Sequence, residues 1–319
     1  MTTRTPVLVD CDTGVDDAMA LLYLLQRDDI DVVGITTVFG NNTAAACAHN
    51  SLRVLELVGR EDIPVAVGAE KPLVGEVTYL ATHVHGDDGL GDSGLPMEVS
   101  TPVSELTAVE LIDELSERHR GRLRILAVAP LTNIAHALDA IPDLTDRVVD
   151  VVIMGGAADA AGNQSPAAEA NIIHDPEAAQ RVLSAGWSTT LVPLDVTMIE
   201  VVTEEHRARM LAAVTPVSRF FAATTDFYFG GYGLDSYGVR SSPCHDALAA
   251  AILTGEVVPT VFPLLRVEVD CSDGPSRGAT IVDTRGRYKG YPDQPGATCR
   301  VALLTDGTFP DKLVAALGG

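Results

Sequence analysis

Short apolar runs alternate with helical patterns between residues 6 and 193, and this alternation constrains the fold more than any other feature. The runs are apolar on both faces, which is typical of parallel strands covered by helices. The expected strands are Pro6–Cys11, Asp31–Val38, Ile63–Val67, Leu123–Val128, Val148–Met154 and Thr189–Pro193. The expected helices are Asp16–Gln26, Thr43–Val58, Ser104–Arg118, Leu131–Leu138 and Pro176–Ala185.

The C-terminal third is less regular. Its expected helices are Thr203–Val214, Val217–Phe229 and Cys244–Leu253, and its late strands are Leu264–Val269, Ala279–Asp283 and Cys299–Leu304. Because no linker or repeat interrupts the chain, we expect one α/β domain over residues 1–319. Its core would be an open, mostly parallel sheet covered by helices, with small C-terminal antiparallel additions. Two long loops, Glu70–Ser100 and Gly155–Asn171, are candidates for function.

Charge and cysteine content exclude several classes of protein. The 22 Lys and Arg residues face 44 Asp and Glu residues, for a net charge of −22. Such a field repels phosphates and anionic lipids, so we expect neither a nucleic acid nor a membrane as partner. The five cysteines are widely spaced without a CxxC pair. Together with an N-terminus that lacks a signal-peptide pattern, they predict reduced thiols and a cytoplasmic location.

The most informative segment follows the first expected strand and reads VLVDCDTGVDDAMALL. Asp10, Asp12, Asp16 and Asp17 fall within eight residues, at the strand edge where open α/β sheets bind ligands. Helix capping explains one or two of these acids but not four. Crowded carboxylates that stay ionised need a cation, and their hard oxygens suit Mg²⁺ or Ca²⁺.

Two chemistries fit this segment. One is phosphoryl transfer through an aspartyl nucleophile, as in haloacid-dehalogenase-like phosphatases, although Gly14 and the Asp16-Asp17 pair depart from that pattern. The other follows from a resemblance to the inosine–uridine-type nucleoside hydrolases, whose signature is D-x-D-P-G-x-D-D. Thr13 stands here where Pro is common. Further segments that resemble this family, in order, are ITTVFGNNT, HVHGDDGLG, VAPLTNIA, VVIMGGA, GNQSPAAEANIIHDPEAA and SPCHDALA.

The resemblance implies a Ca²⁺ site and a reaction. The ion would be held by Asp12, Asp17, Asp246 and the backbone carbonyl of Val128, and Asp12 would deprotonate the attacking water. Asp10 would support these ligands by hydrogen bonding. His245 would assist departure of the base, because histidine has a suitable pKa for a general acid.

The resemblance also implies a ribose pocket built from amides and carboxylates. Its residues would be Asp16, Asn41, Asn163, Glu169 and Asn171. Two further substrate-binding residues would be His83, which approaches the base or the sugar, and Met154. We expect Glu169 and Asn171 to face the same side of an extended segment. The aromatic stretch DFYFGGYGLDSYG is either a lid over the base or a helix end buried in the core. The single Trp187 lies away from all motifs, which favours a histidine over a stacked tryptophan as the group that activates the base.

The predicted function is hydrolysis of the N-glycosidic bond of ribonucleosides to ribose and free base. The resemblance also implies a homodimer or homotetramer. Two alternatives remain at this point, namely the phosphatase and a non-catalytic protein that binds a nucleoside or ribose.

Overall fold

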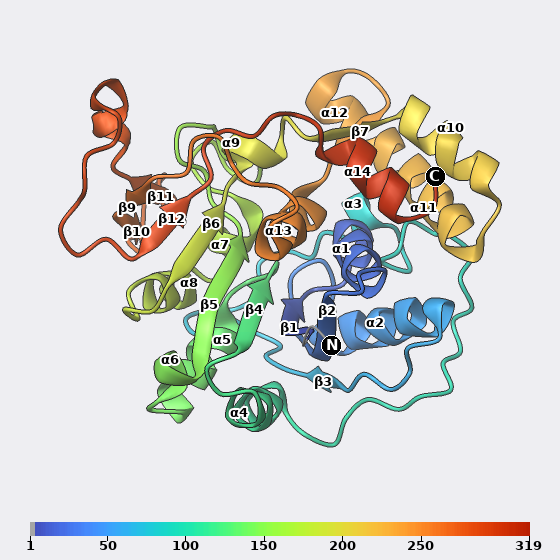
Figure 1. The fold of residues 1–319 in the computed structure, drawn as a ribbon, viewed down its shortest axis with the longest axis horizontal. Helices are drawn as coiled ribbons and strands as arrows, with labels where there is room; N and C mark the ends of the chain where they lie inside the picture. The colour runs from blue at the N-terminus through green and yellow to red at the C-terminus, as the bar shows by residue number, and fades with distance from the viewer. Residues whose placement is uncertain (1–3) are drawn as a thin grey trace.

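The computed structural model describes residues 4–319, and its centre is an eight-stranded sheet (Figure 1). The strand order is β3-β2-β1-β4-β5-β6-β12-β9, and β9 runs antiparallel to β12 while the other neighbouring pairs are parallel. The strands are β1 (Thr5–Cys11), β2 (Ile30–Thr37), β3 (Val65–Val67), β4 (Leu123–Ala127), β5 (Val148–Met154), β6 (Thr189–Val192), β12 (Cys299–Val301) and β9 (Leu264–Leu265). The prediction of an open, mostly parallel sheet is confirmed.

Helices cover both faces of the sheet. Successive residues of β1 alternate between two hydrophobic layers, with Val7 and Val9 in one layer and Leu8 in the other. The first layer includes residues of α1 (Val15–Leu25), α2 (Ala44–Val58) and α13 (His245–Thr254). The second includes residues of α4 (Ala108–Arg118), α5 (Thr132–Ala140) and α8 (Pro176–Leu183). Burial on both faces explains why the strands are apolar throughout.

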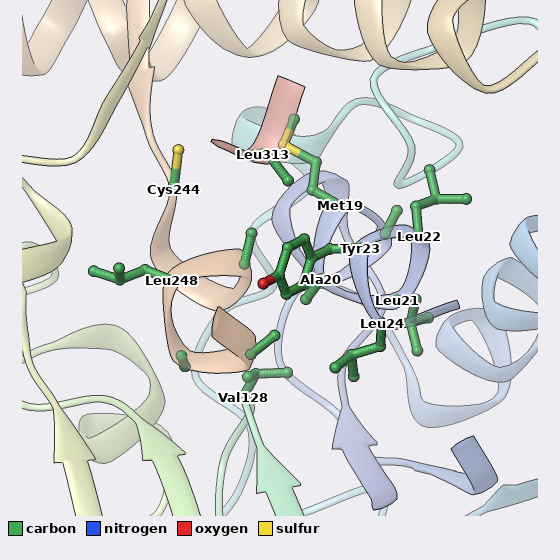
Figure 2. Close-up of a cluster of buried hydrophobic side chains, with 14 of the residues drawn as sticks. Met19, Ala20, Leu21, Leu22, Tyr23, Leu24, Val128, Cys244, Leu248 and Leu313 are labelled. Atoms are coloured by element: carbon green, nitrogen blue, oxygen red, sulfur yellow. The ribbon is translucent and has the colours of Figure 1, made fainter. Parts of the chain in front are cut away.

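Helix α1 is buried along almost its whole length, from Val15 to Leu24. Figure 2 shows its side chains, among them Tyr23, beside Leu248 of α13 and Leu313 of α14 (Phe309–Ala316). The Tyr23 ring also packs edge-on against Phe309 at a centroid distance of 5.7 Å. Because neighbours enclose this helix, the two aspartates in its first turn have a fixed position.

Helix ends follow local sequence signals. The Thr43 side chain accepts a hydrogen bond from the Ala46 amide at 3.2 Å, which caps the start of α2. Gly59 ends the same helix with a φ of 67°, a left-handed conformation that favours glycine. Asp175 caps α8 by accepting from the Ala178 amide at 3.0 Å.

The C-terminal third carries the small antiparallel additions that the sequence predicts. They pair β7 (Val201–Thr203) with β8 (Ser241–Pro243), and β10 (Val267–Val269) with β11 (Thr280–Val282). The late strand β12 instead joins the main sheet beside β6, because its backbone pairs in parallel with Thr189–Leu191. The remaining elements are α3 (Thr82–His85), α6 (Leu144–Arg147), α7 (Ala170–His174), α9 (Leu194–Thr197), α10 (Glu204–Ala213), α11 (Pro216–Tyr228), the π-helical turn η1 (Phe229–Gly233), α12 (Leu234–Tyr237) and the 3₁₀ helix η2 (Thr284–Lys289).

The chain order of the strands fixes the position of a site. From β1 the chain proceeds to β2 and β3 on one side, whereas β4, β5 and β6 follow on the other. Open α/β sheets bind ligands at the carboxyl ends of the strands where this order reverses, here between β1 and β4. Among residues 4–319, no helix is long and apolar enough to cross a membrane.

Candidate active site

A pocket of about 280 Å³ lies at this edge of the sheet. The predicted site residues that line it are Asp12, Asp16, Asn41, His83, Val128, Met154, Asn163, Glu169, Asn171, His245 and Asp246. Asp17 does not line the pocket, but it is buried against the aspartates that do. The structure therefore brings together residues that are more than 230 positions apart in the sequence.

The floor of the pocket is a cluster of buried carboxylates. Oxygen atoms of Asp16, Asp17 and Asp246 lie within 4.8 Å of one another. Asp16 and Asp17 come from the first turn of α1 and Asp246 from the first turn of α13, two helices that pack together. Asp12 follows β1 and is also buried.

Backbone amides hold these carboxylates in place. Asp17 accepts hydrogen bonds from the amides of Asp12 at 3.1 Å and Gly14 at 2.8 Å, and from Asn41 Nδ2 at 3.1 Å. Asp12 Oδ2 accepts from the Asn41 amide at 2.8 Å. A Cβ atom at Gly40 would lie 2.0 Å from Asp12 Oδ2, so the VFGNN segment needs glycine there.

This floor has the chemistry of a site for a hard divalent cation. Burial and the neighbouring Asp17 raise the pKa of Asp12, and burial with Asp16 raises the pKa of Asp17 to about 7. Burial and Asp16 likewise raise the pKa of Asp246. Asp16 Oδ1 is buried without a hydrogen-bond partner among the described residues. Crowded, dehydrated oxygens of this kind are neutralised by protons or by a cation.

Asp10 lies beneath the pocket and does not line it. Its Oδ1 accepts hydrogen bonds from Thr36 Oγ1 at 2.6 Å and Asn133 Nδ2 at 2.8 Å. Burial raises its pKa to about 7. Asp10 thus links β1 to β2 and α5 beneath the carboxylate cluster.

Glu169 and Asn171 form one side of the pocket. The prediction that they lie on an extended segment is wrong. Glu169 is the N-cap of α7 and Asn171 lies in its first turn, because the Glu169 carboxylate accepts from the amides of Asn171 at 2.9 Å and Ile172 at 3.2 Å. Burial raises the pKa of Glu169 to about 7. Asn171 Nδ2 donates to the carbonyls of Val128 at 3.1 Å and Met154 at 3.2 Å, across the ends of β4 and β5.

The two histidines of the HVHG segment differ in environment. His83 lines the pocket but is exposed, whereas His85 is buried. His85 Nδ1 accepts a hydrogen bond from the Val15 amide at 3.1 Å, and burial lowers its pKa to about 3. Its Nε2 therefore carries the proton of a neutral ring. Asn163 is also exposed, and its Oδ1 accepts from the Ala170 amide at 3.0 Å.

His245 lies at the start of α13 with a partner on each ring nitrogen. Nδ1 is 2.8 Å from Thr197 Oγ1, and Nε2 is 3.2 Å from Tyr232 Oη. The Tyr232 ring stacks on Tyr228 at a centroid distance of 5.3 Å. Burial lowers the pKa of His245 to about 4, and the negative charge of Asp16 opposes this shift.

The 227–237 aromatic stretch contributes to the core and to the pocket wall, and its role as a lid stays a prediction. Phe229 is buried in the core, whereas Tyr228 and Tyr232 line the pocket. Trp187 is buried in the core, and its Nε1 donates to the Val182 carbonyl at 3.0 Å.

Sequence reasoning missed other residues at the site, among them two that line the pocket and one that contacts His245. Thr197 orients His245, and Tyr79 and His174 line the pocket. No quoted motif contains Thr197 or Tyr79, and Thr197 precedes His245 by 48 positions in the chain. His174 lies within the quoted segment GNQSPAAEANIIHDPEAA, where the sequence analysis gives it no role. The available signal for His174 is its place in that segment, between Asn171 and Asp175.

Comparison with known proteins decides the family. The sequence profile described as "Inosine-uridine preferring nucleoside hydrolase" matches residues 7–309. This chain belongs to that family. Its ribonucleoside hydrolase activity, cleavage of the N-glycosidic bond, follows from this match and from relatives over the full length. The phosphatase and the non-catalytic binding protein gain no support.

Relatives cover nearly the whole chain. The pyrimidine-specific ribonucleoside hydrolase RihA of Shewanella woodyi is 38% identical over 98% of this chain and 97% of its own length. The solved structure of a plant nucleoside hydrolase, the PpNRh1 enzyme, has a TM-score of 0.89 at 30% identity and covers 99% of both chains. A purine-preferring ribonucleoside hydrolase from Gardnerella vaginalis has a TM-score of 0.88 at 28% identity and covers 98% of both chains.

Proposed function

We propose that this nucleoside hydrolase cleaves ribonucleosides by direct attack of water, with Asp12 as the general base and Ca²⁺ as the cofactor. One observation carries the proposal. The buried carboxylate cluster, the Glu169–Asn171 side and His245 open into the same pocket. One cavity therefore holds groups that complement the attacking water, the ribose and the leaving base.

The carboxylates of Asp12, Asp17 and Asp246 and the carbonyl of Val128 would hold the cation. Asp16 lies within the geometric cluster and is a further candidate ligand. Flexible sets of carboxylate and carbonyl oxygens suit Ca²⁺ better than the strict octahedron of Mg²⁺. When bound, such a cation lowers the pKa of water and orients it for attack.

The ribose is bound by polar groups that the backbone already orients. The Asp16 carboxylate, the Asn41 amide and the Asn171 amide are candidates for its hydroxyls, with Asn163 at the exposed mouth of the pocket. Positive charge develops on the sugar ring as the glycosidic bond breaks. Carboxylates beside the sugar stabilise that charge more in the transition state than in the bound substrate.

His245 assists the base through its partners. Its ring is neutral at pH 7, since burial lowers its pKa to about 4. Because Nε2 faces the Tyr232 hydroxyl at 3.2 Å, we infer that this pair donates a hydrogen bond to the leaving base, which stabilises its negative charge until it takes up a proton from water. Thr197 holds Nδ1 at the other side of the ring.

The proposal also covers the oligomer and the location, whereas the names of relatives point to different base preferences. Relatives carry names that specify pyrimidines in one case and purines in another. We propose a homodimer or homotetramer, which sedimentation analysis can test. We also propose a cytoplasmic location, supported by five free cysteines.

The test is ribose release from inosine, uridine and cytidine by purified protein, with Ca²⁺ and after chelation. We expect release with Ca²⁺ and loss of at least about 10³-fold in kcat for Asp12→Asn. Asp28→Asn, at an exposed position, is the matched control. Full activity of Asp12→Asn would reject its role, and activity that survives chelation would reject the cation.

A further inference from the structure

Thr280 on strand β11 is a buried residue that does not line the pocket and that the proposed mechanism does not use. Its hydroxyl makes two hydrogen bonds to one residue of the loop that follows β5. Oγ1 accepts from the Ala157 amide at 2.8 Å and donates to the Ala157 carbonyl at 2.6 Å. Both backbone polar groups of Ala157 are therefore paired with a single side chain that lies 123 residues away in the chain.

Ala157 belongs to the turn that supplies a hydrogen bond to Glu169. The preceding residue, Gly156, has a φ of 78°, and its amide donates to Glu169 Oε2 at 2.9 Å. A Cβ atom at Gly156 would lie 2.8 Å from Thr280 Cγ2, so the threonine packs directly against this turn. Thr280 thereby fixes the direction of the amide that Glu169 accepts from.

The other hydrogen bonds to the Glu169 carboxylate come from α7. They are donated by the amides of Asn171 at 2.9 Å and Ile172 at 3.2 Å. The carboxylate thus joins two separate segments, the turn after β5 and the first turn of α7. Its position is defined only while these two segments keep their relative position.

The antiparallel β10–β11 pair contacts both of these segments. Strand β10 follows β9 at the edge of the main sheet (Figure 1). Gly278, two residues before Thr280, has a φ of 82°, and a Cβ atom there would lie 2.8 Å from Ile173 Cα of α7. Arg277 pairs with Glu177 of α8 at 2.8 Å, and α8 follows α7 directly. The β10–β11 pair is therefore anchored on α7 and α8, while Thr280 holds the turn after β5.

The position of Glu169 affects the rate because a charged group stabilises a transition state best when it is already oriented. We propose that Thr280 is a positioning residue for the Glu169 carboxylate, acting through the backbone of Gly156 and Ala157. Thr280 itself contacts no substrate, since it does not line the pocket. This inference rests on the proposed function, in which Glu169 is one of the carboxylates beside the sugar.

The experiment is a double-mutant cycle between Thr280→Val and Glu169→Gln. The substrate is whichever of uridine, cytidine and inosine the wild type cleaves fastest. Valine keeps the shape of threonine and removes the hydroxyl, so kcat should fall about tenfold and KM should change less than about threefold. Glu169→Gln should lower kcat about 100-fold. The double variant should match Glu169→Gln within about twofold, because the hydroxyl acts through the carboxylate.

Further variants separate positioning from a general loss of structure. Thr280→Ser keeps the hydroxyl and should retain kcat within about twofold of the wild type. Thr189→Val is the matched control, since Thr189 is a buried strand residue outside the pocket whose hydroxyl donates to the Thr298 carbonyl at 3.4 Å. It should leave kcat unchanged in the wild type and in Glu169→Gln. If Thr280→Val does not fold, Thr280→Ala replaces it in the cycle, and its loss should likewise vanish in the Glu169→Gln background.

Three results would overturn the inference, namely losses that multiply in the double variant, an unchanged kcat of Thr280→Val, or equal losses for Thr280→Ser and Thr280→Val. In each of these cases, ribose release by the wild type upholds the proposed function. Absence of any release by the wild type would instead reject the proposed function.

Discussion

Replacing Asp246 by Asn isolates the charge repulsion inside the carboxylate cluster. The substitution keeps the shape of the side chain and removes its negative charge. In protein stripped of cations, Asp246 shares a buried space with Asp16 and Asp17, and oxygens of all three lie within 4.8 Å. Removing one charge should therefore stabilise the cation-free protein. The same substitution should abolish catalysis.

The magnitude follows from this distance. Two full charges 4.8 Å apart repel by about 3.5 kcal/mol at an effective dielectric constant of about 20. Asp246 has two such neighbours, Asp16 and Asp17, but protonation of one carboxyl in the cluster relieves part of the repulsion. We expect Asp246→Asn to raise the free energy of unfolding by about 3 kcal/mol at pH 8.

The sign of the pH dependence is fixed by the direction of the pKa shifts. Burial and neighbouring acids raise the pKa of Asp246, and that of Asp17 to about 7. A raised pKa in the folded state costs stability as pH rises through that value. The advantage of Asp246→Asn should thus shrink at pH 5, where the cluster binds protons.

The assay is urea unfolding in EDTA at pH 5 and pH 8, with Asp28→Asn as an exposed control. Addition of Ca²⁺ should then stabilise the wild type and leave Asp246→Asn nearly unchanged. A variant less stable than the wild type at pH 8, or equal stabilisation of both by Ca²⁺, would refute the reasoning.

Three further substitutions test the packing around the pocket. Thr197→Val removes the hydroxyl beside His245 Nδ1, so kcat on ribonucleosides should fall about tenfold, with a smaller fall on 4-nitrophenyl riboside; equal falls would contradict the role. His174→Phe removes a ring whose pKa burial lowers to about 4, so urea unfolding should show the wild type losing up to about 3 kcal/mol relative to the variant between pH 6.5 and 4. Parallel profiles would argue against this. Gly233→Ala places a Cβ 1.6 Å from the Ser241 carbonyl, so thermal unfolding should show destabilisation of about 2 kcal/mol or more; an unchanged Tm would be inconsistent with this packing.

The sequence predicts the sheet well because the parallel strands are apolar over their whole length. Val7 and Leu8 face different layers yet are both apolar, so the run stands out without any knowledge of its partners. Helix ends such as Thr43 and Gly59 also carry local signals. The late strand at Cys299–Val301 is predicted as a strand, but its place beside β6 is not, since that place depends on pairing across more than 100 residues.

The same distinction applies to the site. The aspartates of the first turn are adjacent in the chain, so their crowding is visible in the sequence. The local conformation at Glu169 is not visible in the sequence, because its carboxylate caps α7 through hydrogen bonds from the amides of Asn171 and Ile172. Tyr79 and Thr197 carry no pattern of their own, and only the packing of distant segments brings Tyr79 to the pocket and Thr197 to His245.

The central claim is that the pocket between β1 and β4 hydrolyses ribonucleosides with Asp12 as the base. The most direct measurement is ribose release from inosine, uridine and cytidine by the Ca²⁺-loaded wild type and by Asp12→Asn in parallel. The predicted result is release of ribose and free base in equal amounts by the wild type, with loss of release in a variant that remains folded. Release of ribose from none of the three nucleosides, or equal release by Asp12→Asn, would contradict it.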